Sequence, residues 1–275
     1  NAIHVLPVVR KLIFEGRNKE AQRLIDANFL TQQHGMSYLT LGSLYLEFPE
    51  HQNGSGFYRE LNLENATTTT RYQVDDVTYT RTTFASFTDN VIIMHIKASK
   101  ANALNFTIAY NCPLVHKVNV QNDQLTVTCQ GKEQEGLKAA LRAECQIQVK
   151  TNGTLRPAGN TLQINEGTEA TLYISAATNY VNYQDVSADE SHRTSEYLKR
   201  AMQIPYEKAL KNHIAYYKKQ FDRVRLTLPA GKASQLETPK RIENFGNGED
   251  MAMAALLFHY GRYLLISSSQ PGGQP

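Results

Sequence analysis

The sequence has no tryptophan, only three cysteines, and no apolar run of the roughly 18 residues that a membrane-spanning helix requires. Cys112, Cys129 and Cys145 are odd in number and lack CxxC spacing, which argues against a disulfide framework and against a structural zinc site. We therefore expect three free thiols, with Cys145 an inert buried side chain, and neither a bound metal nor a cofactor. The longest apolar run, residues 251–266, is interrupted at 259–262, so no membrane partner is predicted.

The chain also carries little excess charge of either sign. Lysine and arginine number 29 against 26 acidic residues, and the basic side chains are scattered apart from a short cluster at 216–219. A nucleic-acid-binding protein concentrates positive charge on one surface, so no nucleic-acid partner is predicted. With 275 residues, 41% of them hydrophobic, the chain can build one large domain or two ordinary ones.

The first two thirds of the chain predict a helical start followed by a large antiparallel β-sandwich. Helical spacing over residues 3–30, interrupted near Gly16, indicates two short helices. From Tyr38 to Phe48 the apolar residues alternate with a period of two, which is typical of a strand. Asp75 and Asp76 read as a hairpin turn rather than a catalytic carboxylate pair, since neighbouring strand residues point to opposite faces. The further predicted strands are 58–63, 66–74, 77–85, 91–97, 104–110, 125–130, 137–150, 161–165 and 170–178.

The composition changes after residue 183, which we take as the end of the sandwich domain. Residues 184–248 are predicted to form a helical linker and connection. This region comprises helices at 189–202 and 206–223, a short strand at 224–228 and a polar stretch at 229–248. A last helix, from about 249 to 267, is apolar on nearly every side. We expect residues 249–275 to begin a further domain whose other helices cover this one.

No self-contained catalytic motif is present: the sequence lacks a GxSxG elbow, a P-loop, a GxGxxG turn and an HExxH helix. His95 reads as a satisfied sheet histidine, while His192 and His213 read as solvated helix positions. Four N-x-S/T sequons occur, which signify glycosylation only in a eukaryotic secreted protein. They lie at Asn53, Asn65, Asn105 and Asn152.

Arg262 is the single candidate for a substrate-binding residue. It lies in the apolar terminal helix, and a buried guanidinium needs a partner to offset its desolvation, as an active-site wall can provide. The alternative is an ordinary buried helix in which Gly261 permits close packing. In this chain alone, we expect the helix to pack only partly and Arg262 to lack its full set of partners.

Eight blocks of sequence, in order and spread over nearly the whole chain, resemble the amino-terminal part of glycoside hydrolase family 95, the inverting α-L-fucosidases. Ser43 departs from the pattern, because many relatives carry an acidic residue there. The matching blocks are VRKLIFEGR at 9–17, EAQ at 20–22, YLTLGSLYLEF at 38–48, YRELNL at 58–63, YTR leading into FAS at 79–86, AATNY at 176–180, FDRV at 221–224 and YGRYLLISSS at 260–269.

The resemblance implies four parts: a β-super-sandwich, a helical linker, an (α/α)6-barrel catalytic domain and a C-terminal β-domain. It implies hydrolysis with inversion, in which a glutamic acid protonates the leaving oxygen and asparagines supported by an aspartate activate a water. Those residues belong to the barrel beyond Pro275, so we expect no catalytic residue in this chain. The fold expected here is a β-super-sandwich, linker helices and the first helix of a truncated (α/α)6 barrel.

The resemblance also implies a parent enzyme in the periplasm or outside the cell that acts on fucosylated oligosaccharides or glycans with terminal α-1,2-linked L-fucose. A specificity for α-L-galactosides is compatible with it, because L-galactose adds only one hydroxyl at C6. We expect the sandwich and linker to contact the parent's own barrel. The chain starts at Asn1 without a methionine and stops at Pro275, so we expect a piece of a longer protein.

A non-catalytic carbohydrate-binding sandwich is the alternative. Such a module stacks aromatic rings on sugars, and the 15 tyrosines of this chain offer rings where tryptophan is absent. An apolar helix at the end of the chain has no purpose in a stand-alone binding module, and this feature favours the enzyme.

Overall fold

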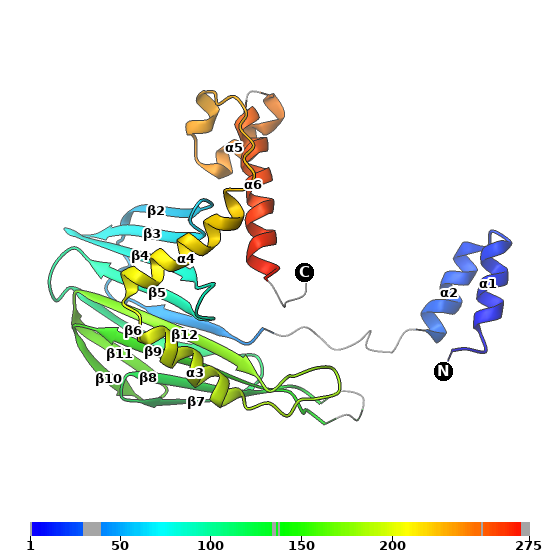
Figure 1. Ribbon diagram of the computed structural model, residues 1–275, viewed down its shortest axis with the longest axis horizontal. Coiled ribbons are helices and arrows are strands. Elements are labelled where there is room, and N and C mark those ends of the chain that lie inside the picture. The colour runs from blue at the N-terminus through cyan, green and yellow to red at the C-terminus, as the bar shows by residue number, and fades with distance from the viewer. Residues whose placement is uncertain (1, 30–39, 134–135, 137, 249, 271–275) are drawn as a thin grey trace. The chain divides into compact units, whose positions relative to one another are not determined.

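The computed structural model describes residues 2–29, 40–133, 136, 138–248 and 250–270 (Figure 1). The chain divides into two compact units, one within residues 1–40 and 133–138 and the other within 41–132 and 139–275. Among the helices of the described residues, none is long and apolar enough to cross a membrane. The domain boundaries at 183/184 and 248/249 remain predictions.

The first unit contains a pair of helices, α1 (Leu6–Phe14) and α2 (Asn18–Asn28). Val9, Leu12 and Ala21 are its buried apolar residues. Gly16 lies between the helices with a φ of 74°, a conformation that suits glycine because it has no Cβ. The predicted pair of short helices within residues 3–30 is therefore confirmed over the described residues; residue 30 and the start of the predicted strand at Tyr38 lie outside them.

The second unit is built on two antiparallel sheets whose facing sides enclose the main apolar core (Figure 1). The smaller sheet has the strand order β1-β6-β11-β10, and the larger has the order β2-β3-β4-β5-β12-β9-β8-β7. The predicted β-sandwich is confirmed. The strands are β1 (Ser43–Glu47), β2 (Ser55–Asn62), β3 (Thr67–Val74), β4 (Val77–Ala85), β5 (Ile92–Ala98), β6 (Leu104–Asn111), β7 (Val115–Gln121), β8 (Gln124–Gln130), β9 (Arg142–Thr151), β10 (Thr154–Ala158), β11 (Thr161–Gly167) and β12 (Glu169–Thr178).

The turn at Asp75 and Asp76 is confirmed, since Val74 pairs with Val77 across the β3–β4 hairpin and Asp75 has a φ of 51°. The predicted strand at 137–150 is too long at its start. β9 begins at Arg142, opposite Gln130, because its partner β8 ends there. Leu137 itself lies outside the described residues.

Two strands escaped the sequence analysis. β7 lies at the edge of the larger sheet, and its residues alternate between exposed and half-buried. β10 contains Pro157, which is tolerated because this strand lies at the edge of the smaller sheet, where one side of the backbone needs no partner.

The helices after the sandwich are α3 (Glu190–Met202), α4 (Tyr206–Phe221), α5 (Thr238–Asn244) and α6 (Met251–Ser268). α3 packs on β12 and β9, and α4 continues along the same face of the larger sheet, where a second apolar cluster forms (Figure 1). Short 3-10 turns at Lys232–Gln235 and Phe245–Asn247 flank α5, so residues 229–248 have more structure than the polar connection predicted for them.

The predicted strand at 224–228 is wrong. These residues join no sheet, because side chains of α6 bind their backbone instead. The Arg262 guanidinium donates to the Val224 carbonyl at 2.7 Å, and His259 Nε2 lies 3.0 Å from the Leu226 carbonyl oxygen. Side chains of α6 thus take the place of a neighbouring strand.

Candidate functional site

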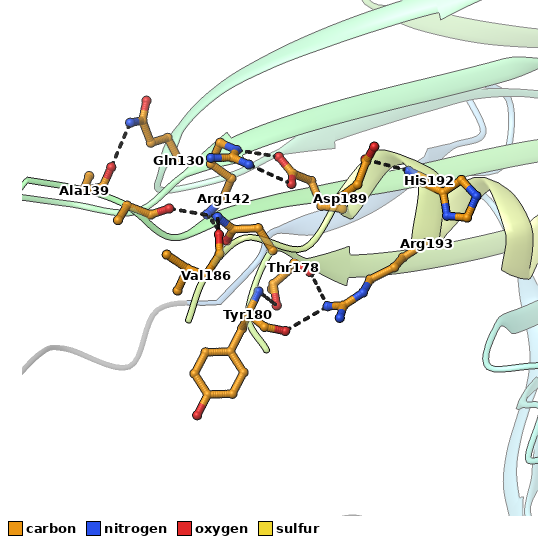
Figure 2. Close-up of polar contacts among 12 residues, drawn as sticks. Gln130, Ala139, Arg142, Thr178, Tyr180, Val186, Asp189, His192 and Arg193 are labelled. Carbon is orange, nitrogen blue, oxygen red and sulfur yellow. Dashed lines mark hydrogen bonds and ion pairs between the residues drawn. The ribbon is translucent and has the colours of Figure 1, made fainter. Parts of the chain in front are cut away.

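A network of polar contacts joins the end of the sandwich to the start of the linker helices (Figure 2). Its centre is Asn179, which follows β12 and is fully buried. The Asn179 amide nitrogen donates to the carbonyls of Ala140 and Val186 at 3.0 and 2.8 Å, and its side-chain oxygen accepts from the Arg142 backbone at 2.8 Å. One side chain thus holds three segments together: the entry to β9, the exit from β12 and the loop before α3.

Two arginines complete this network (Figure 2). Arg142 makes a two-pronged contact with Glu190 at the start of α3, at 2.7 and 3.2 Å, and this contact lowers the pKa of the Glu190 carboxyl. Arg193, one turn into α3, donates to the carbonyls of Thr178 and Tyr180. The network orients α3 on the sandwich. Its polar side chains make their hydrogen bonds within the network.

His213 was predicted to be a solvated helix position, and the structure contradicts this. Its side chain is 1% exposed on α4, between the rings of Phe84 and Phe87. The Nε2 atom lies 3.0 and 3.1 Å from the carbonyl oxygens of Asn65 and Ala66, so the neutral ring with a proton on Nε2 fits the site. The ring borders a groove of about 380 Å³ that also contacts Tyr216 and Tyr263. In contrast, His95 is a satisfied sheet histidine as predicted, with Nδ1 2.9 Å from the Thr171 hydroxyl.

Burial lowers the pKa of His213 below its ordinary value of 6.5, and it does the same for His51 and His95. Below about pH 6.5 the unfolded chain therefore binds protons that the folded chain does not bind. The free energy of unfolding is highest above that pH and falls as the solution becomes more acidic. We expect the urea midpoint of unfolding to decrease between pH 7.5 and 5.5. His213→Gln should flatten this dependence of the urea midpoint on pH. An unchanged slope in His213→Gln would contradict the burial argument.

The C-terminal end of α4 is the place where α6 attaches. Tyr217 of α4 is fully buried; its hydroxyl donates to the Leu63 carbonyl at 2.7 Å, and its ring stacks on Phe221. Arg262 of α6 donates to the carbonyls of Gln220 and Val224 at 3.1 and 2.7 Å, and its guanidinium lies 4.8 Å from the centre of the Phe221 ring. A cation at the C-terminus of a helix is favourable, because the carbonyls there are unpaired and the helix dipole is negative.

Arg262 therefore has partners within this chain, since carbonyls and an aromatic ring receive its guanidinium. That it lacks its full set of partners stays a prediction. Its position is that of a clamp between α4 and α6. A contact of Arg262 with substrate remains a prediction.

The N-terminal end of α6 is fixed by a second charged contact that the sequence analysis missed. Asp250 accepts from the Met253 backbone as the N-cap of the helix, and Arg241 of α5 grips both of its carboxylate oxygens at 2.8 and 3.0 Å. The guanidinium of Arg241 holds the pKa of Asp250 below its usual range. An aspartate directly before an apolar helical run is a recognised signal for the start of a helix, so Asp250 could have been predicted as the N-cap from the sequence.

A groove of about 580 Å³ lies between α6, the 224–228 segment and the β2–β3 turn. Three acidic side chains line it: Glu60 accepts from Tyr58 and Asn62, Glu64 lies 4.0 Å from Arg225, and Asp222 is the third. His259 faces this groove with Nε2 on the Leu226 backbone. Within the described residues, no group of three or more histidine, cysteine or acidic side chains is placed to hold a metal ion.

The other half of α6 is an uncovered apolar surface, which we call the outer face of α6. Only Ala255 of this helix is buried, whereas Leu257 and Leu265 are 66% and 65% exposed. At 100° per residue the exposed side chains fall within one half of the helix circumference, with Gly261 near its middle. The partial packing expected for this helix is confirmed. The large apolar residues of the outer face are Met251, Leu257, Phe258, Tyr260, Leu264 and Leu265.

Two protein-family models match different parts of the chain. The glycosyl hydrolase family 65, N-terminal domain, matches residues 1–183, and the glycosyl hydrolase family 95 catalytic domain matches residues 205–275. Alpha-L-fucosidase 2 of Arabidopsis thaliana is 29% identical, over 99% of this chain and 36% of that protein. "Probable alpha-fucosidase A" of Aspergillus niger is 25% identical, over 98% of this chain and 35% of that protein. The chain spans about a third of the length of these curated relatives.

Proposed function

Since this chain belongs to the glycoside hydrolases that join a family 65 N-terminal domain to a family 95 catalytic domain, we propose that it is the amino-terminal part of an α-L-fucosidase. The observation that carries the proposal is the alignment of almost the whole chain with two α-fucosidases. The family 95 match begins at residue 205, so it includes α4 and α6. The sandwich and α3 then serve as the base on which the catalytic domain is built.

The outer face of α6 supports this division of labour. A monomeric soluble protein rarely leaves a large apolar patch uncovered, and such a patch marks a contact with another part of the structure. We propose that the remaining helices of the protein's own (α/α)6 barrel pack against this face. Arg262 and Asp250, through their contacts with the ends of α4 and α5, would hold α6 in place to receive them.

Gly261 allows a test of this packing. In this chain a Cβ at Gly261 would meet nothing within 4 Å, so Gly261→Ala should stabilise the helix by about 1 kcal/mol through helix propensity. In a longer polypeptide that adds the rest of the catalytic domain, the same methyl group would press on a neighbouring helix and should lower stability by about 1–3 kcal/mol. Urea unfolding of the shorter and the longer polypeptide measures whether Gly261→Ala raises or lowers the free energy of unfolding in each.

The control for this comparison is Lys211→Ala on the exposed side of α4, which should change little in either length. Stabilisation by Gly261→Ala in both lengths would show that the outer face stays uncovered, and the proposed barrel contact would then be wrong.

The proposed reaction is hydrolysis of terminal α-1,2-linked L-fucose with inversion, in a protein located in the periplasm or outside the cell. An inverting enzyme places water on the face opposite the leaving group, so the sugar is released first as the β-anomer. The longer polypeptide, incubated with 2′-fucosyllactose and followed by proton NMR, should show β-L-fucose before mutarotation. Release of the α-anomer first would contradict inversion. Hydrolysis of an α-L-galactoside but of no α-L-fucoside would contradict the proposed sugar.

A further inference from the structure

Two cysteines from different sheets meet in the core of the sandwich. Cys112 directly follows β6 of the smaller sheet, and Cys129 lies on β8 of the larger sheet. Their Sγ atoms are 3.7 Å apart, and both side chains are buried. This is van der Waals contact between two sulfurs, and a disulfide requires a further approach to about 2.05 Å. The proposed hydrolytic reaction does not involve either cysteine.

The third cysteine is placed differently. Cys145 lies on β9 directly opposite Val127, whereas Cys129 is opposite Ala143. Cys129 Sγ contacts Cys112 and the Leu41 carbonyl, and Cys112 Sγ accepts from the Leu114 backbone at 3.4 Å. The fold therefore selects one of the possible cysteine pairs.

We propose that Cys112 and Cys129 are a disulfide-forming pair that links the two sheets when the chain folds in an oxidising compartment, and that Cys145 stays a thiol. The three free thiols expected from the sequence would then be the reduced state of the protein. The proposal rests on the sulfur geometry and is independent of the proposed enzymatic activity.

The oxidant is a disulfide of a small molecule or of an oxidoreductase. One cysteine thiolate attacks it to give a mixed disulfide and releases one thiol; the second cysteine then attacks the protein sulfur and releases the other. The two protein sulfurs lose two electrons to the reagent disulfide, and their two protons end on the two released thiols. Burial raises the pKa of Cys129 to about 12 in the folded chain. Exchange is therefore expected while the chain folds or opens, rather than in the closed core.

The test compares the folded chain with its unfolded form. The soluble 275-residue chain is isolated from a bacterial periplasm, its free thiols are alkylated under denaturing conditions, and its peptides are mapped by mass spectrometry. Cys112 and Cys129 are 17 residues apart and Cys129 and Cys145 are 16 apart, so loop closure alone favours neither. In guanidinium with a mixture of reduced and oxidised glutathione, we expect both cross-links in similar amounts. In the folded chain we expect the Cys112–Cys129 link at least tenfold over any other.

Variants complete the design. Cys145→Ser should leave no free thiol in the periplasmic protein, whereas Cys112→Ser and Cys129→Ser should each leave two. Reduction of the wild-type chain with dithiothreitol should lower its melting temperature by roughly 5–10 °C, and the same treatment of Cys112→Ser should change nothing. Three alkylated thiols in the periplasmic chain, or a dominant link through Cys145, would overturn the proposal.

Discussion

Replacing Asn179 with alanine is expected to lower the free energy of unfolding of the sandwich unit by about 3 kcal/mol. The amide side chain is fully buried and makes three hydrogen bonds, to the backbones of Ala140, Arg142 and Val186. Alanine leaves those backbone groups without their partner and opens a small void beside them. Each unpaired buried polar group costs about 1–3 kcal/mol, reduced here because some of these backbones lie near the surface.

Urea unfolding followed by circular dichroism measures this loss as a lower midpoint with an unchanged slope. A matched control is Asn182→Ala in the following loop, because Asn182 is exposed and its side chain accepts one bond from the Gln184 backbone. We expect the control to remain within about 0.5 kcal/mol of the original chain. Equal midpoints for Asn179→Ala and Asn182→Ala would show that the network of Figure 2 does not hold the linker to the sandwich.

Local sequence signals predicted most of the fold, because many of its elements are specified by neighbouring residues. The Asp75–Asp76 turn lies between two runs of strand-forming residues, and Pro205 precedes α4 where a helix can begin. The apolar circumference of α6 likewise predicted a helix that requires partners. β10 was missed for the opposite reason: Pro157 argues against a strand, and only the position of β10 at a sheet edge removes the objection.

The candidate site depended on contacts between residues far apart in the chain, which the sequence alone does not specify. His213 belongs to a helix with many polar residues, and its burial arises because the β2–β3 turn supplies the carbonyls of Asn65 and Ala66. Arg262 was correctly singled out as a charge that needs partners. Its partners proved to be the Gln220 carbonyl in the last turn of α4 and the Val224 carbonyl in the segment that follows. A local pattern can identify such a need without showing which residue meets it.

The proposed division between a supporting sandwich and a catalytic barrel predicts a large difference in activity. This chain contributes the supporting sandwich and α6. Of the acidic side chains at the groove beside α6, Glu60 contacts Tyr58 and Asn62, and Glu64 lies near Arg225. Without a free general acid and a positioned base for water, contributions of roughly 10²–10⁴-fold each are lost. We expect hydrolysis to require the remainder of the family 95 catalytic domain.

Fucose release from 2′-fucosyllactose, measured in parallel for this chain and for a longer polypeptide that includes the rest of the catalytic domain, tests this claim most directly. The account predicts L-fucose from the longer polypeptide and only the buffer rate from the 275-residue chain at equal concentration. Release by the purified chain alone above the buffer rate, at a level that rises with its concentration, would contradict the account and place a complete active site within these residues.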